Sequence, residues 1–109
     1  MRKVAVHRVF LAPFNKWLSM QVVELDLSGK VAGLTSLCEE QRATEWLGGV
    51  IVIASKSPKR MEGESFSDFC NRLCSEEDAV SLADCQAYHI IQFDVAGMNF
   101  TPASRLICL

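Results

Sequence analysis

The chain has 109 residues, half of them hydrophobic and 22% charged, with a formal net charge of −2. This length fits a single domain over residues 1–109, and this balance of hydrophobic and charged residues excludes intrinsic disorder. The small negative net charge argues against nucleic acid as a partner, because phosphate binding needs a concentrated basic face.

The sequence also argues against membrane-spanning and secreted proteins. No apolar stretch reaches the length of about 18 residues that suggests a membrane-spanning helix. The first residues, Met1-Arg2-Lys3, lead into an alternating segment rather than into a signal-peptide core. Five cysteines, an odd number without an export signal, fit reduced thiols better than a disulfide framework. We therefore expect a cytoplasmic protein that does not bind membranes.

Alternating apolar residues predict three consecutive strands that form a meander: Val4 to Leu11, Trp17 to Leu27 and Val31 to Leu37. Gly29 supplies the flexible residue of the turn between the second and third strands. One face of the first strand is expected to carry Ala5, His7, Val9 and Leu11, and the other face Val4, Val6, Arg8 and Phe10.

The run from Trp46 to Ile53 is the most β-prone part of the chain. Val50 to Ile53 are all β-branched and uninterrupted by charge, which favours a central strand. Gly48 and Gly49 before them suggest a bulge or a close backbone approach. Residues 55–64 are rich in Ser, Pro, Lys and Gly, and we expect a loop there.

The second half of the chain predicts one clear helix and two further strands. Ser65 is expected to cap a helix from Phe66 to about Cys74, because Asp68 follows in capping-box spacing. A second short helix is possible over Ala79 to Ala83. The last strands are expected at Cys85 to Val95 and Arg105 to Leu109. The fold class is therefore α+β and β-rich, with five to six mostly antiparallel strands and one or two short helices.

The segment from Val22 to Ile53 resembles the opening of amidohydrolase-type, metal-dependent hydrolases. It contains an alternating strand, a Ser28-Gly29-Lys30-Val31 turn and the Gly48-Gly49 pair before an apolar strand. The resemblance implies the accessory, composite β domain of that family, with Tyr88 to Leu109 as its returning strands. The catalytic barrel has no room, since only 56 residues follow Ile53 and such a barrel needs about 250. No His-x-His pair is present to inherit the family's metal site.

One set of residues has the ligand types of a structural zinc site: Cys70, Cys74, Cys85 and His89. The spacing is poor, because chelating turns normally hold two cysteines three residues apart. Buried free cysteines behave as small hydrophobic residues. We therefore expect core packing at these positions and no metal or cofactor.

Catalytic patterns are missing from the sequence. Cys85 and His89 would lie about 13 Å apart on one extended strand, too far for a nucleophile and its base to share a hydrogen bond. There is no Gly-x-Ser-x-Gly, no phosphate-binding glycine-rich loop and no His-Glu-x-x-His. His7, on an apolar strand, is interpreted as a structural histidine. We expect a protein that is not an enzyme.

Five residues are candidates for contacts with a partner: Trp17, Trp46, Lys56, Lys59 and Arg60. The two tryptophans could equally be lids on a small core. The three basic residues precede the stretch from Glu62 to Asp84, which holds seven acids and one arginine. Such asymmetry is typical of a solvated surface, and head-to-tail self-association is the alternative.

Three functions stay open at this point. The first is a non-catalytic domain that acts through protein contacts, most simply as a homo-oligomer. The second is a small-molecule-binding protein or enzyme, with a pocket between the sheet and the Phe66 to Cys74 helix that is rimmed by Trp46 and the Lys56 to Arg60 loop. The third is a structural zinc module.

Overall fold

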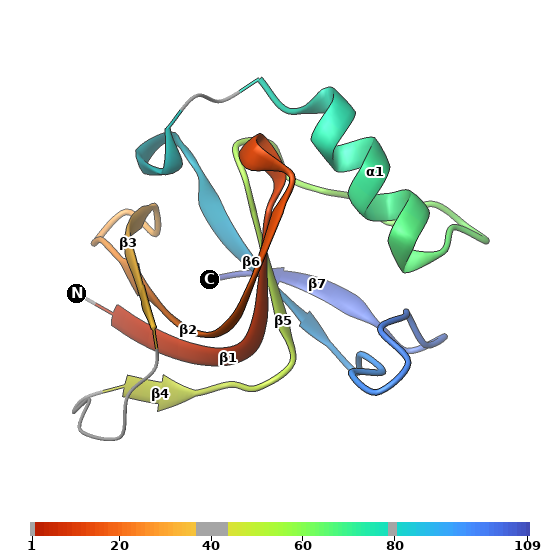
Figure 1. Ribbon diagram of the computed structural model, residues 1–109, viewed down its shortest axis with the longest axis horizontal. Helices are drawn as coiled ribbons and strands as arrows, with labels where there is room; N and C mark the ends of the chain where they lie inside the picture. The colour runs from red at the N-terminus through yellow and green to blue at the C-terminus, as the bar shows by residue number, and fades with distance from the viewer. Residues whose placement is uncertain (1, 37–43, 79–80) are drawn as a thin grey trace.

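A computed structural model describes residues 2–36, 44–78 and 81–109. It contains one curved sheet with a helix packed on one side (Figure 1). The described strands are β1 (Arg2–Leu11), β2 (Lys16–Leu25), β3 (Val31–Ser36), β4 (Thr44–Trp46), β5 (Val50–Ala54), β6 (Gln86–Ile91) and β7 (Arg105–Cys108). The helix is α1 (Phe66–Glu76), and two 3-10 turns cover Ala12–Phe14 and Leu82–Asp84.

The strand order is β3-β2-β1-β5-β6-β7. The short strand β4 pairs with the first half of β1, on the same side on which β5 pairs with its second half. β1, β2 and β3 form the predicted antiparallel meander, and β5, β6 and β7 form a second antiparallel group. Only the pairings of β1 with β4 and β5 are parallel in the described part of the chain. The β-rich, mostly antiparallel α+β class is therefore confirmed, with seven described strands instead of five or six.

β5 is the central strand that the sequence predicts. All five of its residues are buried, and it lies between β1 and β6. The apolar run from Trp46 to Ile53 is not one strand, however, because β4 ends at Trp46 and β5 begins at Val50. Gly48 and Gly49 between them both have a φ of +68°, a conformation that residues with a Cβ rarely adopt. The glycines thus redirect the chain from one pairing with β1 to the next.

The predicted alternation along β1 is wrong beyond Val6. Val4 and Val6 contribute to the same core as Val9 and Leu11. The alternation breaks because the backbone N–H groups of both His7 and Arg8 donate to the carbonyl of Gly49, at 3.1 and 3.2 Å. From this point the side chains of β1 face the opposite way, although the register with β2 is unchanged. Met20, opposite His7 on β2, has a φ of +49°, so both strands bend together.

Two hydrophobic cores lie on opposite faces of the sheet. The first is enclosed by the curl of the sheet, because the N–H of Val31 donates to the carbonyl of Cys85 at 3.0 Å and Lys30 forms a bridge with Gln86. This contact ties the start of β3 to the start of β6. The second core is covered by α1 and the segment 92–104. The first core contains Val4, Val6, Val9, Leu11, Val23, Leu25, Val31, Ile51, Ile53, Cys85 and Ala87.

The helix forms as the sequence predicts and continues two residues further, to Glu76. Ser65 caps it, and its Oγ accepts the N–H of Asp68 at 3.2 Å. Phe66, Phe69, Cys70 and Leu73 form the buried face. No helix in the described ranges is long and apolar enough to cross a membrane.

Several predicted elements differ from the structure in their bounds or type. β2 ends at Leu25 instead of Leu27, because the Asp26 carboxylate accepts the backbone N–H of both Ser28 and Lys30 at 2.9 Å and starts the turn. β6 ends at Ile91 instead of Val95, since a turn follows in which Asp94 and Asn99 exchange backbone hydrogen bonds. In place of the predicted second helix there is a 3-10 turn at Leu82–Asp84. Position 37 of the predicted third strand and positions 79 and 80 of the predicted second helix lie outside the described residues.

Candidate functional site

The four residues considered for zinc are not brought together. Cys70 lies in the core under α1, whereas Cys85 lies in the core on the other face of the sheet. Burial raises the pKa of the Cys70 thiol to about 12 and that of Cys85 to about 11. Both thiols are therefore protonated at neutral pH, which makes them poor nucleophiles and poor ligands. The described residues contain no group of three or more His, Cys, Asp or Glu that could hold a metal ion.

The two histidines of the chain hold the Gly48-Gly49 segment from two sides. Nδ1 of His7 accepts the N–H of Gly49 at 2.8 Å, so this nitrogen carries no proton. Nε2 of His89 lies 3.0 Å from the carbonyl of Gly48 and must donate, because a carbonyl only accepts. The sequence analysis identified His7 as structural but missed this arrangement. The only sequence signal for it is the glycine pair itself.

The two candidate tryptophans pack against the protein. The ring of Trp46 on β4 meets that of His7 edge to face, with centroids 4.9 Å apart. Trp17 on β2 packs on Phe10 at 4.9 Å and on Phe66 at 5.7 Å. These contacts support the interpretation of both tryptophans as lids, although both keep part of their surface exposed.

A hollow of about 270 Å³ lies between the sheet and α1, at the place where the sequence analysis puts a pocket. Trp17 lines it, but neither Trp46 nor the loop 55–64 does. Half of its lining is apolar, from Phe10, Trp17, Phe66 and Met98, and half is polar, from Asn15, Ser67, Cys70 and Asn71. None of these described lining residues is charged. A separate hollow of about 210 Å³ lies between that loop, the end of β5 and α1, and Lys56 and Lys59 line it.

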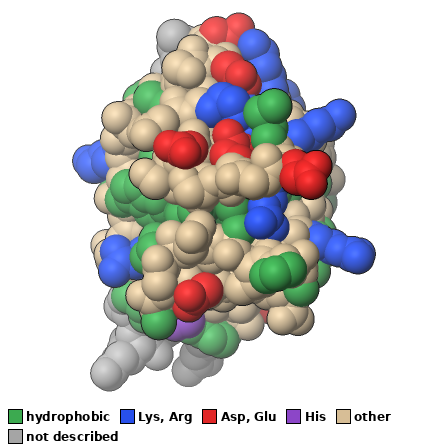
Figure 2. Space-filling view, turned by 90° about the vertical axis from the view of Figure 1, so that its right-hand side faces the viewer, with side chains coloured by type: hydrophobic (Ala, Val, Ile, Leu, Met, Phe, Trp, Pro, Cys, Tyr) green, Lys and Arg blue, Asp and Glu red, His purple; other side chains and the backbone are tan. Residues whose placement is uncertain are grey.

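Two ion pairs join the loop 55–64 to α1 and to the chain just after it. Lys56 pairs with Asp78 at 3.4 Å, and Nε of Arg72 lies 2.9 Å from Oε2 of Glu64. Figure 2 shows basic and acidic side chains interspersed over the side of the molecule that carries α1. On this side of the molecule, the described charges thus form no separate basic and acidic surfaces, which argues against head-to-tail self-association driven by charge there.

Of the other two basic candidates, Arg60 is held by the protein itself. Its guanidinium lies 4.4 Å from the ring centroid of Phe100 and donates to the carbonyl of Thr101 at 2.8 Å. The carbonyl of Lys59 accepts a hydrogen bond from Nη2 of Arg72 at 2.5 Å. These contacts fasten the loop 55–64 to α1 and to the segment before β7.

The ion pair of Glu64 and Arg72 makes the stability of the fold depend on pH. The hydrogen bond from Arg72 holds the pKa of Glu64 below its usual range. The contribution of this pair to the free energy of unfolding is therefore complete at any pH above the pKa that Glu64 has in the unfolded chain. It is lost as pH falls through the lower pKa that Glu64 has in the folded chain. We expect Glu64→Gln to lower the free energy of unfolding by about 1 kcal/mol at pH 7, with the difference shrinking below about pH 4. Urea unfolding between pH 3 and 7 measures this. Glu62→Gln, at an exposed neighbour, is the control, and a difference independent of pH would contradict the assignment.

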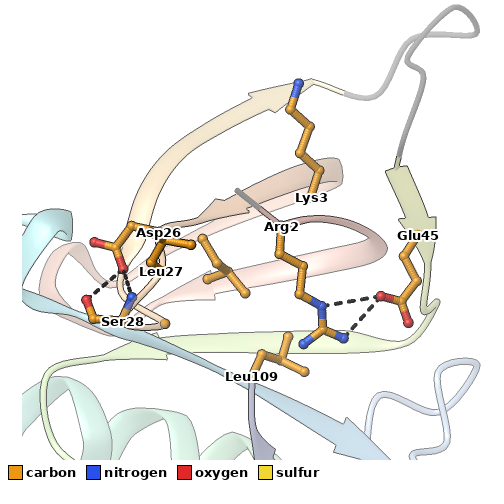
Figure 3. Close-up of a pocket in the computed structure, with 9 residues that line it drawn as sticks. Arg2, Lys3, Asp26, Leu27, Ser28, Glu45 and Leu109 are labelled. Carbon is orange, nitrogen blue, oxygen red and sulfur yellow. Dashed lines mark hydrogen bonds and ion pairs between the residues drawn. The ribbon is translucent and has the colours of Figure 1, made fainter.

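Another hollow lies beside the turn between β2 and β3, with a volume of about 670 Å³ (Figure 3). Its charges are already paired. Arg2 reaches across to Glu45 at 3.1 Å, and Lys3 lies 3.8 Å from Glu24. The Asp26 carboxylate is occupied by the turn, chiefly by the hydroxyl of Ser28, which lowers its pKa. The charged side chains described in this hollow thus all have partners within the chain.

The free edge of β7 offers unused backbone groups. β7 is the last strand in the order, and the N–H of Leu109 donates to the carbonyl of Ala87 at 2.9 Å. In an antiparallel ladder, residues that bond to the neighbouring strand alternate with residues that do not. Counting back from Leu109 along the register, the N–H and C=O groups of Leu106 and Cys108 therefore point away from β6. In the described part of the chain, these groups have no backbone partner.

The side chains of β7 leave this edge unprotected. Ile107 at its middle is 45% exposed, which is unusual for a large aliphatic side chain within a sheet. Natural edges are usually protected by shortness, proline, charges or a bulge. β7 is short, with four residues, and begins with the charged Arg105, but it has no proline and no charge from Leu106 onward. The edge is thus suited to pairing with another strand.

No protein-family model, curated protein or solved structure matches the chain. The resemblance to the accessory β domain of amidohydrolases therefore stays a prediction. A proposal of function has to come from the surfaces of the molecule itself.

Proposed function

We propose that the protein is a non-catalytic cytoplasmic domain that binds another polypeptide by adding a strand to the free edge of β7. The observation that carries this proposal is the pair of outward-facing backbone groups at Leu106 and Cys108, next to the exposed side chain of Ile107. In strand addition, backbone hydrogen bonds supply affinity, and alternate side chains supply specificity.

Other features of the molecule agree with binding rather than catalysis. The thiols of Cys70 and Cys85 are buried and protonated, and both histidines bond to the Gly48-Gly49 backbone. The hollow beside the β2–β3 turn has its lysine and arginine paired with carboxylates of the chain. The mixed charges on the α1 side provide no basic face for nucleic acid.

A proline at Cys108 tests this function. Cys108→Pro removes the outward N–H but no bond to β6, and proline is tolerated at such edge positions. Cys108→Ser keeps the N–H and is the matched control. In affinity capture from cell extract, we expect wild type and Cys108→Ser to retain a polypeptide, either this chain or another, that Cys108→Pro loses. Retention of the same polypeptides by all three proteins, or of none by any, would contradict strand addition at β7.

A further inference from the structure

We propose that the edge of β7 pairs with the same edge of a second copy of this chain, antiparallel about a two-fold axis at Ile107. This inference rests on the proposed function and names the occupant of the same edge. A two-fold contact requires a surface that complements itself. The backbone of β7 meets that requirement.

The positions of the outward groups determine the register. If Leu106 faces Cys108 of the second copy, then Cys108 faces Leu106 of that copy by symmetry. Each of these residues contributes one outward N–H and one outward C=O, so the two contacts form four backbone hydrogen bonds. An axis at Leu106 would instead place Cys108 opposite Ser104. Ser104 precedes the strand and is buried, and its hydroxyl donates to the carbonyl of Gln92 at 2.8 Å.

The same register buries the exposed side chain at the centre of the edge. Ile107 would face Ile107 of the second copy as a pair without mutual backbone hydrogen bonds, the type in which side chains approach most closely. The Ile107 side chain that is 45% exposed in one copy is thereby covered. Arg105 would face Leu109 rather than its own copy, so no like charges oppose each other.

The charge and size of the contact indicate a weak dimer. The net charge of −2 gives little repulsion between copies, and the charged groups around α1 are paired within each chain. A contact made by one short strand is smaller than the roughly 1,200 Å² at which stable interfaces begin. We therefore expect a dimer that forms and dissociates with concentration in the range accessible to sedimentation.

Oppositely charged substitutions at position 107 test the two-fold axis. Ile107 is exposed, so Ile107→Lys and Ile107→Glu are expected to fold with melting curves close to wild type. Each variant alone would place like charges opposite each other, and we expect at least about tenfold weaker dimerisation for each. An equimolar mixture of the two variants should regain the dimer, because opposite charges then meet at the axis. Sedimentation equilibrium of the purified full chain measures all four samples.

A cysteine cross-link provides a second test of the register. Ile107→Cys in a Cys108→Ser background is expected to form a disulfide-linked dimer under mild oxidation, since facing residues of this pair type lie within disulfide distance. Leu106→Cys in the same background is the matched control. It should not cross-link, because its thiol would face the serine at position 108.

Three results would overturn the inference: wild type that stays monomeric at every concentration, a mixture that does not regain the dimer, or equal cross-linking of the two cysteine variants. If purified wild type is monomeric while a different polypeptide is captured and then lost with Cys108→Pro, this inference fails and the proposed function stands. If Cys108→Pro has no effect on any association, both fail.

Discussion

Phe69→Ala is expected to lower the free energy of unfolding by about 3–5 kcal/mol. Phe69, on the inner face of α1, is fully buried, and its ring lies 5.2 Å from that of Phe100 and 6.2 Å from that of Phe66. Truncation removes its contacts with both rings and leaves a cavity between the helix and the sheet. Because domains of this size are stable by about 5–15 kcal/mol, the loss should be plain in urea unfolding followed by circular dichroism.

The control for this substitution is Phe14→Ala in the 3-10 turn after β1. Phe14 is 50% exposed, so the same truncation should change the free energy of unfolding by no more than about 0.5 kcal/mol. A loss below about 1.5 kcal/mol for Phe69→Ala would contradict the packing of α1 on the sheet. The result also bears on the proposed edge, because Phe100 belongs to the segment that leads into β7.

The parts of the fold that follow from neighbouring residues were predictable. The Ser65 cap and the apolar spacing after it give the helix, since both signals act within one or two turns. The turn between β2 and β3 follows from Asp26 and Gly29, which bond and bend locally. The unbroken β-branched run at Val50 gives a central strand because such a run is suited to burial on both faces.

The bend of β1 could not be predicted, because its cause lies more than 40 residues away. His7 and Arg8 have the sequence pattern of ordinary alternating positions. The carbonyl of Gly49, which accepts both of their N–H groups, lies at the point where the alternation breaks. The parallel pairing of β1 with β5 that brings Gly49 there is likewise a long-range contact. Local sequence gives strand propensity but not the partner of a strand.

The candidate site was missed for the same reason. The sequence predicts a strand from Arg105 to Leu109 but does not say that it lies at the edge of the sheet. The residues that were chosen instead, two tryptophans and three basic residues, are those that dominate known interfaces. Trp17, Trp46 and Arg60 proved to have ring or hydrogen-bond partners within the chain. Exposure of backbone groups depends on strand order, which composition does not reveal.

A comparison of two isoleucines tests in solution whether β7 is an edge. Ile51 on β5 and Ile107 on β7 are both paired with His89, one on each side of β6. The two side chains therefore lie in one row on the same face of the sheet. Ile51 is fully buried, whereas Ile107 is 45% exposed. Burial is thus the main difference between the two positions.

We expect Ile51→Ala to lower the free energy of unfolding by about 2–5 kcal/mol, because it leaves a cavity in the core enclosed by the sheet. Ile107→Ala should cost less than about 1 kcal/mol when unfolding is measured at a protein concentration too low for dimers. At higher concentration the same substitution should weaken association, since it removes the side chain at the proposed axis. Equal losses of stability for the two variants at low concentration would mean that Ile107 is covered within a single chain, and the edge of β7 would then be unable to accept a partner strand.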